Sequence, residues 1–329
     1  MRGRRSNSAT CLKGGIDTGR ASGYSPTAVT STNTRSDGGE KSPSSSTQHP
    51  HNHAPDSTTE ATSTLEEAGR LSFRVVRDLF VGLAAYLGEV LLLLWDSVRA
   101  LRSGIHFGDL IRQMGAIGVD SIPICLLTVG FSGAVLALYT VDTLKQYGAA
   151  SLVGGIVALS IVKETGPILT GVAIAARAGS AITAEIGSMK VTEQVDALRS
   201  MAITPVDYLV VPRLIASLIM LPIVCIWADI AGVVGGAIVA AANGVSYSAY
   251  RESMRLLMET DGSDITKGLL KTVAFGAIIA LVGCLEGLRT EGGATGVGQS
   301  TTRSVVVAIV LIFVADFLLT FLLFNTGLI

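Results

Sequence analysis

Five long apolar stretches, separated by more polar connections, run from residue 122 almost to the end of the chain. Their bounds are Ile122–Tyr139, Leu152–Ala176, Tyr208–Ala242, Gly268–Leu288 and Val305–Phe324. Each approaches or exceeds the roughly 20 residues that an α-helix needs to cross about 30 Å of hydrocarbon. The pattern predicts an all-α integral membrane protein with five transmembrane helices.

Residues 69–102 precede these stretches and predict one long helix that is basic at both ends. Its apolar part, Leu79–Trp95, carries a single charge, Glu89, and is barely long enough to span a membrane. Arginines flank it on both sides, whereas positive charge belongs on one side of a spanning helix. We therefore favour a helix lying in the membrane interface over an additional span. Residues 65–120 as a whole are interpreted as interfacial amphipathic helices.

Residues 1–64 differ from the rest of the chain in composition. Ser, Thr, Gly and Pro dominate, and large apolar side chains are almost absent. Such a segment cannot bury enough surface to fold, so we expect a disordered tail. The predicted organisation is thus a tail (1–64), interfacial helices (65–120) and a five-helix membrane domain (121–329).

The connections between the spans indicate a topology. If the basic 69–102 segment is cytoplasmic, the connections 177–205 and 289–303 are cytoplasmic too. Lys and Arg divide almost evenly between the two sets of connections, so the orientation depends on the 69–102 segment. On the opposite side, "SYSAYRESMRLLMETDG" predicts a short surface helix.

Two charges interrupt the second apolar stretch near its centre. Lys163 and Glu164 lie about halfway along it, where a charge is costly and should face a cavity or a partner. Adjacent helical residues point about 100° apart, so the two are not natural partners for each other. Pro167 has no N–H, which leaves the Lys163 carbonyl without its helical donor. The alternatives are a functional polar site and a structural lock to another charge, such as Asp229 or Asp316.

The second stretch continues into a polar, helix-like segment. Small residues recur every fourth position, at Ala176, Ser180 and Ala184 and at Ala175 and Gly179, which favours close helix packing. Beyond them, "SMKVTEQVDALRSM" (188–201) predicts a short amphipathic helix. It is either a solvated surface helix or a docking element. The residues we assign to docking are Met189, Lys190, Glu193, Gln194, Val195, Leu198 and Met201.

Composition and motifs point away from an enzyme. Only 16% of residues are charged and the net charge is −1, so nothing suggests nucleic acid. "GGATGVGQST" (292–301) resembles a phosphate-binding loop, but Gln299 stands where the lysine should be, and apolar helices flank the segment. We expect its glycines to form a flexible, tight turn. The four cysteines are scattered, and the sequence predicts no catalytic residue, cofactor or metal site.

One long motif resembles a known family. "ETGPILTGVAIAARAGSAITAEIGSMKVTEQVDALRSMAITPVDYLVVPR" (164–213) is similar to the signature region of MlaE-type permeases, the membrane subunits of lipid-trafficking ABC transporters that work with MCE proteins. "TEGGATGVGQSTTRSVV" (290–306) and "VADFLLT" (314–320) match the family's C-terminal part. The resemblance covers about residues 70–329. Glu164 matches the family pattern, whereas the position of Lys163 is commonly Arg.

The resemblance implies a fold and partners. It implies a homodimer with five spans and an N-terminal interfacial helix in each chain, two copies of a separate ABC ATPase on the cytoplasmic face, and a ring of MCE-domain chains on the other. The amphipathic segment at about Gly187–Met201 would be the cytoplasmic coupling helix. Phospholipid would occupy a cavity at the dimer interface. We place the lipid path at Lys163, Glu164, Pro167, Phe131, Leu136 and Tyr139.

Two other functions are kept open. An ion-coupled secondary transporter could relay protons through Lys163, Glu164, Asp229 and Asp316. A purely structural membrane scaffold is the third hypothesis. For the permease, we expect a bacterial inner membrane in preference to a plastid inner envelope, because "ARAGSAITAEIGSM" is more similar to the bacterial branch.

Overall fold

The computed structural model describes residues 77, 81–82, 84–101, 107–260 and 263–325. The predicted tail and much of the predicted interfacial region therefore lie outside the described residues. All regular structure in the described part of the chain is helical. Among the described residues, five helical segments are long and apolar enough to cross a membrane: 107–146, 150–191, 206–242, 264–288 and 293–323. The prediction of an all-α protein with five transmembrane helices is confirmed.

The first span consists of two helices in line. α2 (Phe107–Ile117) leads through a short 3-10 turn, η2 (Val119–Ser121), into α3 (Ile122–Gln146), which has Pro123 in its first turn. Arg177 clamps this junction: its guanidinium donates to the Ala116 carbonyl at 2.9 Å and to Ser121 Oγ at 3.0 Å. A partly exposed charge thus fixes the angle between α2 and α3.

The second span is longer than its apolar stretch predicts. A short 3-10 turn, η3 (Ala150–Leu152), precedes α4 (Val153–Ser160). The helix continues through η4 (Ile161–Thr165), α5 (Gly166–Ile174) and η5 (Ala175–Gly179) to α6 (Ser180–Val191). Both η4 and η5 are π-helical turns, which are wider than α-helical turns and are frequent at functional sites. The backbone stays helical beyond Ala176, where the apolar stretch ends, because the backbone hydrogen bonds of a helix also form outside the hydrocarbon.

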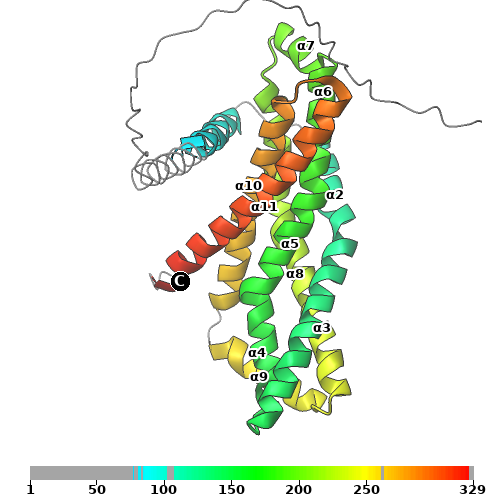
Figure 1. Ribbon diagram of the computed structural model, residues 1–329, viewed down its shortest axis with the longest axis vertical. Helices are drawn as coiled ribbons and strands as arrows, with labels where there is room; N and C mark the ends of the chain where they lie inside the picture. Colours follow the sequence, from blue (N-terminus) through cyan, green and yellow to red (C-terminus); the bar gives the residue numbers. More distant parts are fainter. Residues whose placement is uncertain (1–76, 78–80, 83, 102–106, 261–262, 326–329) are drawn as a thin grey trace, which may run out of the picture. The chain divides into compact units, whose positions relative to one another are not determined.

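The remaining helices complete the bundle. α7 (Gln194–Ser200) follows α6, and a third π-turn, η6 (Val206–Val210), opens α8 (Val211–Ala242). α9 (Tyr247–Thr260) confirms the predicted surface helix, and α10 (Ser263–Leu288) and α11 (Gly293–Asn325) follow. α7 lies at one end of the bundle and α9 at the opposite end (Figure 1). We call these the α7 end and the α9 end.

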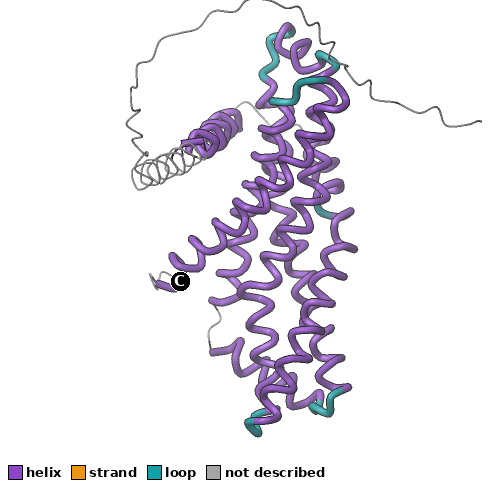
Figure 2. Tube along the Cα trace, viewed as in Figure 1, coloured by secondary structure: helices purple, strands orange, loops and turns teal. Residues whose placement is uncertain are grey.

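Small residues let α8 approach its neighbouring helices closely. α8 packs along α3 and α10, and α10 packs along α6 and α11 (Figure 2). A Cβ at Gly133 of α3 would collide with the Gly232 carbonyl of α8, whereas at Gly130 the nearest atom would be 3.6 Å away. Close backbone contact of this kind is the usual basis of helix association in lipid, where burial alone provides little drive.

Candidate functional site

Charged side chains from three helices meet between η4, α10 and α11. Lys271 Nζ donates a 2.7 Å hydrogen bond to Glu164 Oε2. The same ammonium lies 3.2 Å from Asp316 Oδ1. Thr320, one turn beyond Asp316 on α11, donates to Glu164 Oε1 at 3.3 Å. We call Glu164, Lys271, Asp316 and Thr320 the charged cluster.

Lys271 is the centre of this cluster. Its side chain is 0% exposed, and it also donates to the Lys163 carbonyl at 3.2 Å. That carbonyl cannot receive its usual helical donor because Pro167 has no N–H. The buried ammonium therefore has three oxygen atoms around it: it donates hydrogen bonds to two of them and forms an ion pair with Asp316. A buried charge needs this degree of pairing to be tolerated.

Lys163 has a partner of its own. Its ammonium lies 2.7 Å from Asp264 Oδ2 at the start of α10, and the two side chains are 20% and 5% exposed. Lys163 and Glu164 thus pair with two residues on α10, Asp264 and Lys271, that are seven positions apart and so about two turns apart on one face. Both charges of the second span are tied to the same neighbouring helix.

The two expected carboxylate partners behave differently. Asp316 joins the charged cluster, but Asp229 does not. Asp229 lies against Gly166, and Cys225 Sγ of its own helix is 3.5 Å from its Oδ2. Among the described residues, no hydrogen bond or ion pair links Asp229 to Lys271 or Glu164. The four-residue proton relay considered from the sequence therefore lacks a continuous path here.

Sequence reasoning did not assign roles to Lys271 and Asp264. Their spacing was the available signal, because seven residues on a helix return to nearly the same face. Lys271 is an isolated cation in an apolar stretch, which by itself requires a buried partner. Which acid it meets depends on how α10 sits against η4 and α11, and only the tertiary structure shows that.

The other residues assigned to the lipid path lie elsewhere in the chain. Phe131 and Tyr139 of α3 are both 70% exposed, whereas Leu136 packs partly buried against the core. Phe131 lines an open apolar groove of about 430 Å³ between α3 and α8. Lys163, Glu164 and Pro167 lie together on η4 and the first turn of α5, whereas Phe131, Leu136 and Tyr139 lie on α3.

The predicted amphipathic helix 188–201 is two helices rather than one. Met189 and Lys190 belong to the last turn of α6, and α7 begins only at Gln194. The break falls at Glu193, whose φ of 62° is left-handed, and a second left-handed residue, Ala202 at 60°, follows α7. A single continuous helix was predicted because periodicity does not reveal a one-residue change of backbone direction.

The side chains of α7 divide into packing and surface residues. Val195 is 0% exposed and Leu198 is half-buried, so these two hold α7 against the bundle. Glu193, Gln194 and Met201 are exposed, and Met201 is 61% exposed. Asp196 joins α7 to α6 through Lys190, at 3.0 Å. That ion pair lowers the pKa of Asp196.

An ion pair between buried Arg213 and half-exposed Glu185 connects α8 with α6. Arg213 is only 4% exposed, and its guanidinium lies 2.8 Å from Glu185 Oε2. It also donates to the Leu209 carbonyl at 2.6 Å. A polar cavity of about 140 Å³ adjoins the pair and is bounded on its far side by Asp109 and Arg112 of α2. This pair joins the second span to the third, and residues of the first span line the adjoining cavity.

Residues 84–100 form a helix that contacts the bundle at the α10–α11 turn. Glu89 pairs with Arg289, whose guanidinium also lies 5.7 Å from the centre of the Tyr86 ring. Burial, together with the nearby Glu286 carboxylate, raises the pKa of Tyr86 above its usual value. The five spanning candidates do not include this helix.

The glycine-rich segment 292–301 is mostly helical, so the expectation of a flexible turn was wrong. α11 begins at Gly293, and only Gly292 and Gly293 have the positive φ values of a turn, 84° and 69°. Glycine permits a turn without requiring one, and here the residues from Gly293 onward form a helix. The segment also lacks the strand that precedes a phosphate-binding loop.

Within the charged cluster, the Glu164 side chain is more exposed than Lys271 and Asp316. Lys271 is enclosed and Asp316 is 12% exposed, whereas the Glu164 side chain is 38% exposed. A carboxylate at this position can accept hydrogen bonds from hydroxyl or ammonium groups of an amphiphile. In the described part of the chain, no three His, Cys, Asp or Glu side chains gather in a way that suits a metal ion.

Comparison with known proteins gives consistent results. Residues 110–322 match the family described as Permease MlaE. A probable ABC transporter permease protein of Synechocystis is 41% identical over 230 residues, covering 68% of this chain and 85% of the relative. The intermembrane phospholipid transport system permease protein MlaE of Haemophilus influenzae is 37% identical, covering 68% of this chain and 85% of the relative.

A plant protein is similar over nearly the same region. Protein TRIGALACTOSYLDIACYLGLYCEROL 1, chloroplastic, of Arabidopsis thaliana is 36% identical over 233 residues, covering 69% of this chain and 65% of the relative. The family match, residues 110–322, covers nearly all of the five candidate spans, together with the charged cluster and α7. The chain belongs to the MlaE permease family.

Proposed function

We propose that this chain is the permease subunit of an ABC transporter that moves phospholipid or a related lipid between the inner membrane and an MCE-protein shuttle. As an MlaE permease it is a multi-pass membrane subunit and not itself the catalytic ATPase. ATP hydrolysis is then the work of a separate chain. The names of the Haemophilus and Synechocystis relatives support this assignment.

One structural observation carries the proposal: the second span connects the charged cluster to α7 as one unbroken helical rod. Glu164 stands in η4, and the rod runs from there to Val191. At 1.5 Å per residue this is about 40 Å. A rod transmits axial and rotational displacement over its length, so movement at α7 reaches the cluster. That connection is what a transporter powered by an external ATPase requires.

The proposed orientation places α7 in the cytoplasm. Two ATPase copies would bind the exposed residues of α7 on two permease chains. The MCE ring would then face the α9 end. Closure of the ATPase dimer would push on both copies of α7, narrow the lipid cavity and expel lipid, or run the reverse cycle. A bacterial inner membrane is the proposed location, with a plastid inner envelope as the alternative that the plant relative keeps open.

The face of α11 supports a homodimer. Large apolar side chains stand exposed along it, including Phe313, Phe317 and Phe321 at 52%, 69% and 63%. The α11 span has the smallest buried fraction of the five candidates, 17% in its most apolar window. A second copy would cover part of this face, and the lipid cavity would lie between the copies. Exposed Phe131 and Tyr139 would then reach the lipid path from one chain or the other.

Docking is tested on α7 by co-purification with the ATPase. The variant Gln194→Ala with Met201→Asp changes two exposed side chains and leaves buried Val195 in place. We expect at least a tenfold loss of co-purified ATPase, since interface residues of this kind commonly contribute about 1–2 kcal/mol each. Glu259→Ala, an exposed change at the α9 end, is the matched control. Unchanged co-purification would show that these two side chains do not bind the ATPase.

The polar site is tested by lipid transfer from proteoliposomes to the MCE protein. Glu164→Gln keeps the shape of the side chain and removes its charge, so transfer should fall while membrane insertion and ATPase binding persist. An ion-coupled mechanism predicts the opposite dependence on energy: a protonophore would abolish transfer with ATP still present. Full transfer by Glu164→Gln, with ATP hydrolysis intact, would show that the charge is not needed.

A further inference from the structure

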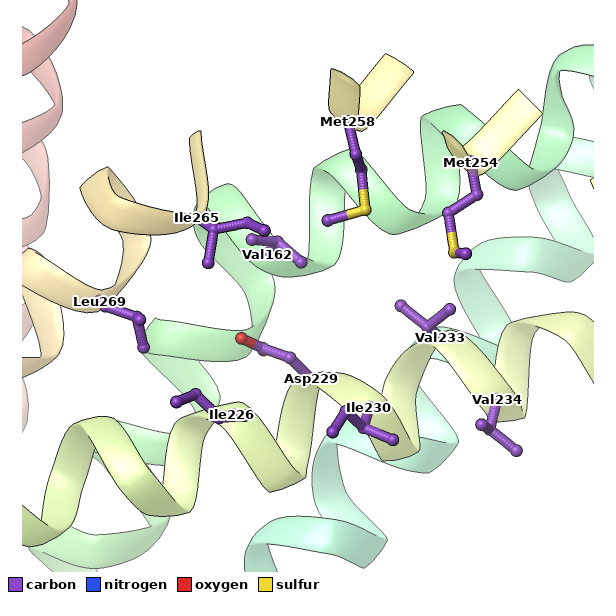
Figure 3. Close-up of a pocket in the computed structure, with 10 residues that line it drawn as sticks. All are labelled: Val162, Ile226, Asp229, Ile230, Val233, Val234, Met254, Met258, Ile265 and Leu269. Atoms are coloured by element: carbon purple, nitrogen blue, oxygen red, sulfur yellow. The ribbon is translucent and has the colours of Figure 1, made fainter. Parts of the chain in front are cut away.

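Two adjoining apolar cavities lie between α8, α9 and α10, and the inner one also reaches Val162 of η4, two residues from Glu164. One has a volume of about 300 Å³ and the other about 470 Å³. They share Val233, Val234 and Met254, so they form one groove, which we call the α8–α9 groove. Figure 3 shows Met254 and Met258 reaching from α9 toward α8, with Leu269 of α10 at the other end.

The groove follows α8 from the α9 end toward the middle of the span. Its lining on α8 extends from Ala241 to Ile226. The fifteen steps between these two residues correspond to about 22 Å of helix. One leaflet contributes only about 15 Å of hydrocarbon. The groove is therefore long enough to receive the acyl chain of a lipid whose head group remains at the α9 end.

A cation stands at the mouth of the groove. Arg251 of α9 lines the outer cavity beside Tyr247, and its side chain is exposed. Among the described residues it makes no ion pair. Arg255, one turn further on, pairs instead with Glu259 at 2.8 Å. An arginine at this level is well suited to bind a lipid phosphate, because its planar guanidinium can form two parallel hydrogen bonds.

The deep end of the groove has little polar character. Asp229 is the one acidic residue in the lining, and it is 9% exposed. Its Oδ2 lies 3.5 Å from Cys225 Sγ, whereas its Oδ1 is buried and has no hydrogen-bond partner among the described residues. Methionine side chains are flexible and adapt to irregular apolar partners, which suits a chain of variable length and unsaturation.

We propose that the α8–α9 groove holds one acyl chain of a phospholipid from the leaflet at the α9 end, with its phosphate bound by Arg251. The deep end of this site adjoins η4 beside the charged cluster, whereas its phosphate contact lies at the α9 end. In a bilayer an acyl chain gains little by leaving other chains for an apolar groove. Selectivity for this lipid therefore depends on the phosphate contact and on the shape of the groove.

The test uses photo-crosslinking with two lipids that carry the same diazirine-labelled acyl chain. One is phosphatidylglycerol and the other diacylglycerol, which lacks the phosphate. The full chain is placed in nanodiscs without nucleotide or ATPase, and labelled peptides are identified by mass spectrometry. We expect peptides of α8 and α9 to be labelled about fivefold more by phosphatidylglycerol, the factor equivalent to about 1 kcal/mol for a basic side chain at an anionic surface.

Matched variants separate the phosphate contact from the groove. Arg251→Gln should remove the preference for phosphatidylglycerol, whereas Arg255→Gln should keep it. Val233→Trp should block labelling of the groove by both lipids. Ile223→Trp, at an exposed position of α8 outside the groove, should leave labelling unchanged.

Three results would overturn the proposal. Even labelling over all exposed faces of α8, unaffected by Val233→Trp, would mean ordinary surrounding lipid. Equal labelling by both probes would show that the phosphate does not contribute to binding. A photoreactive residue at Ile238 that captures a partner chain or a second copy, rather than lipid, would assign the groove to a protein. Because no ATPase is present, these failures are independent of a failure of the transport proposal.

Discussion

Removing the ammonium of Lys271 gives the sharpest test of the charged cluster. In Lys271→Met the side chain keeps its length and loses its charge. Glu164 Oε2 and Asp316 Oδ1 lie 2.7 and 3.2 Å from the same nitrogen, so the two oxygens are at most about 6 Å apart. Without the cation, both carboxylates face each other and the Lys163 carbonyl loses its donor.

The size of the effect follows from that geometry. Two like charges about 6 Å apart repel by roughly 3 kcal/mol at an effective dielectric constant of about 20. Removing one partner of a buried ion pair typically costs about 3–5 kcal/mol, which agrees. For a domain of this size each kcal/mol corresponds to about 2–4 °C in Tm. We expect the melting temperature of Lys271→Met to fall by roughly 6–12 °C.

The assay is thermal unfolding of the purified chain in nanodiscs, followed by tryptophan fluorescence. The control is a triple variant that adds Glu164→Gln and Asp316→Asn to Lys271→Met. Neutral side chains of the same shape remove the repulsion, so most of the lost stability should return. Lipid transfer should stay low in the triple variant if the charges serve transport. A melting temperature of Lys271→Met within 2 °C of the parent chain would refute the reasoning.

Three further expectations concern packing, pH and backbone strain. Gly133→Ala should lower Tm by several degrees, because the added Cβ meets the Gly232 carbonyl and the resulting strain costs about 1–3 kcal/mol. Gly130→Ala, where the added Cβ has room, should have little effect on Tm. Equal effects of the two substitutions would contradict the close crossing of α3 and α8. The pKa of Asp196 is lowered by Lys190, so its stabilising contribution is present above the unfolded pKa and is lost as pH falls through the folded value. The protection factors of the α7 amides, which correct for the intrinsic pH dependence of exchange, should therefore fall in acid, and Asp196→Asn should abolish that dependence. Ala202→Gly should raise Tm slightly, because glycine relieves a left-handed conformation; a lower Tm would mean that the Ala202 side chain contributes to packing.

The number and type of spanning helices could be predicted from the sequence because both depend on local composition. An apolar stretch such as Val305–Phe324 has no alternative in lipid to a helix of sufficient length. The ends of the helices depend on other factors. α6 continues to Val191, well beyond the apolar stretch, and α11 begins at Gly293, twelve residues before it. Helical hydrogen bonds persist outside the hydrocarbon, and hydropathy does not report them.

The candidate site could be predicted only in part, for a different reason. Lys163, Glu164 and Pro167 were recognisable because each is anomalous within its own stretch. Their partners are more than 90 residues away in the chain, and Asp316 rather than Asp229 is the acid that Lys271 reaches. Pairing of this kind depends on the rotation of each helix about its axis, and the π-turns alter that rotation without any clear sign in the hydrophobic pattern.

The two π-turns of the second span also make single-residue deletions in this helix informative. Each accommodates one residue more than an α-helical turn, which displaces everything beyond it by one step, about 100° around the axis. The stretches before η4, between η4 and η5, and after η5 therefore stand in three rotational registers. Deleting one residue inside a π-turn can restore an ordinary α-helix without breaking the rod. Such a deletion removes the extra residue, so the segments on either side keep their faces. A single-residue deletion elsewhere in the rod turns everything beyond it by about 100°. Comparing the two kinds of deletion separates the role of the π-turn from that of the angle between the charged cluster and α7.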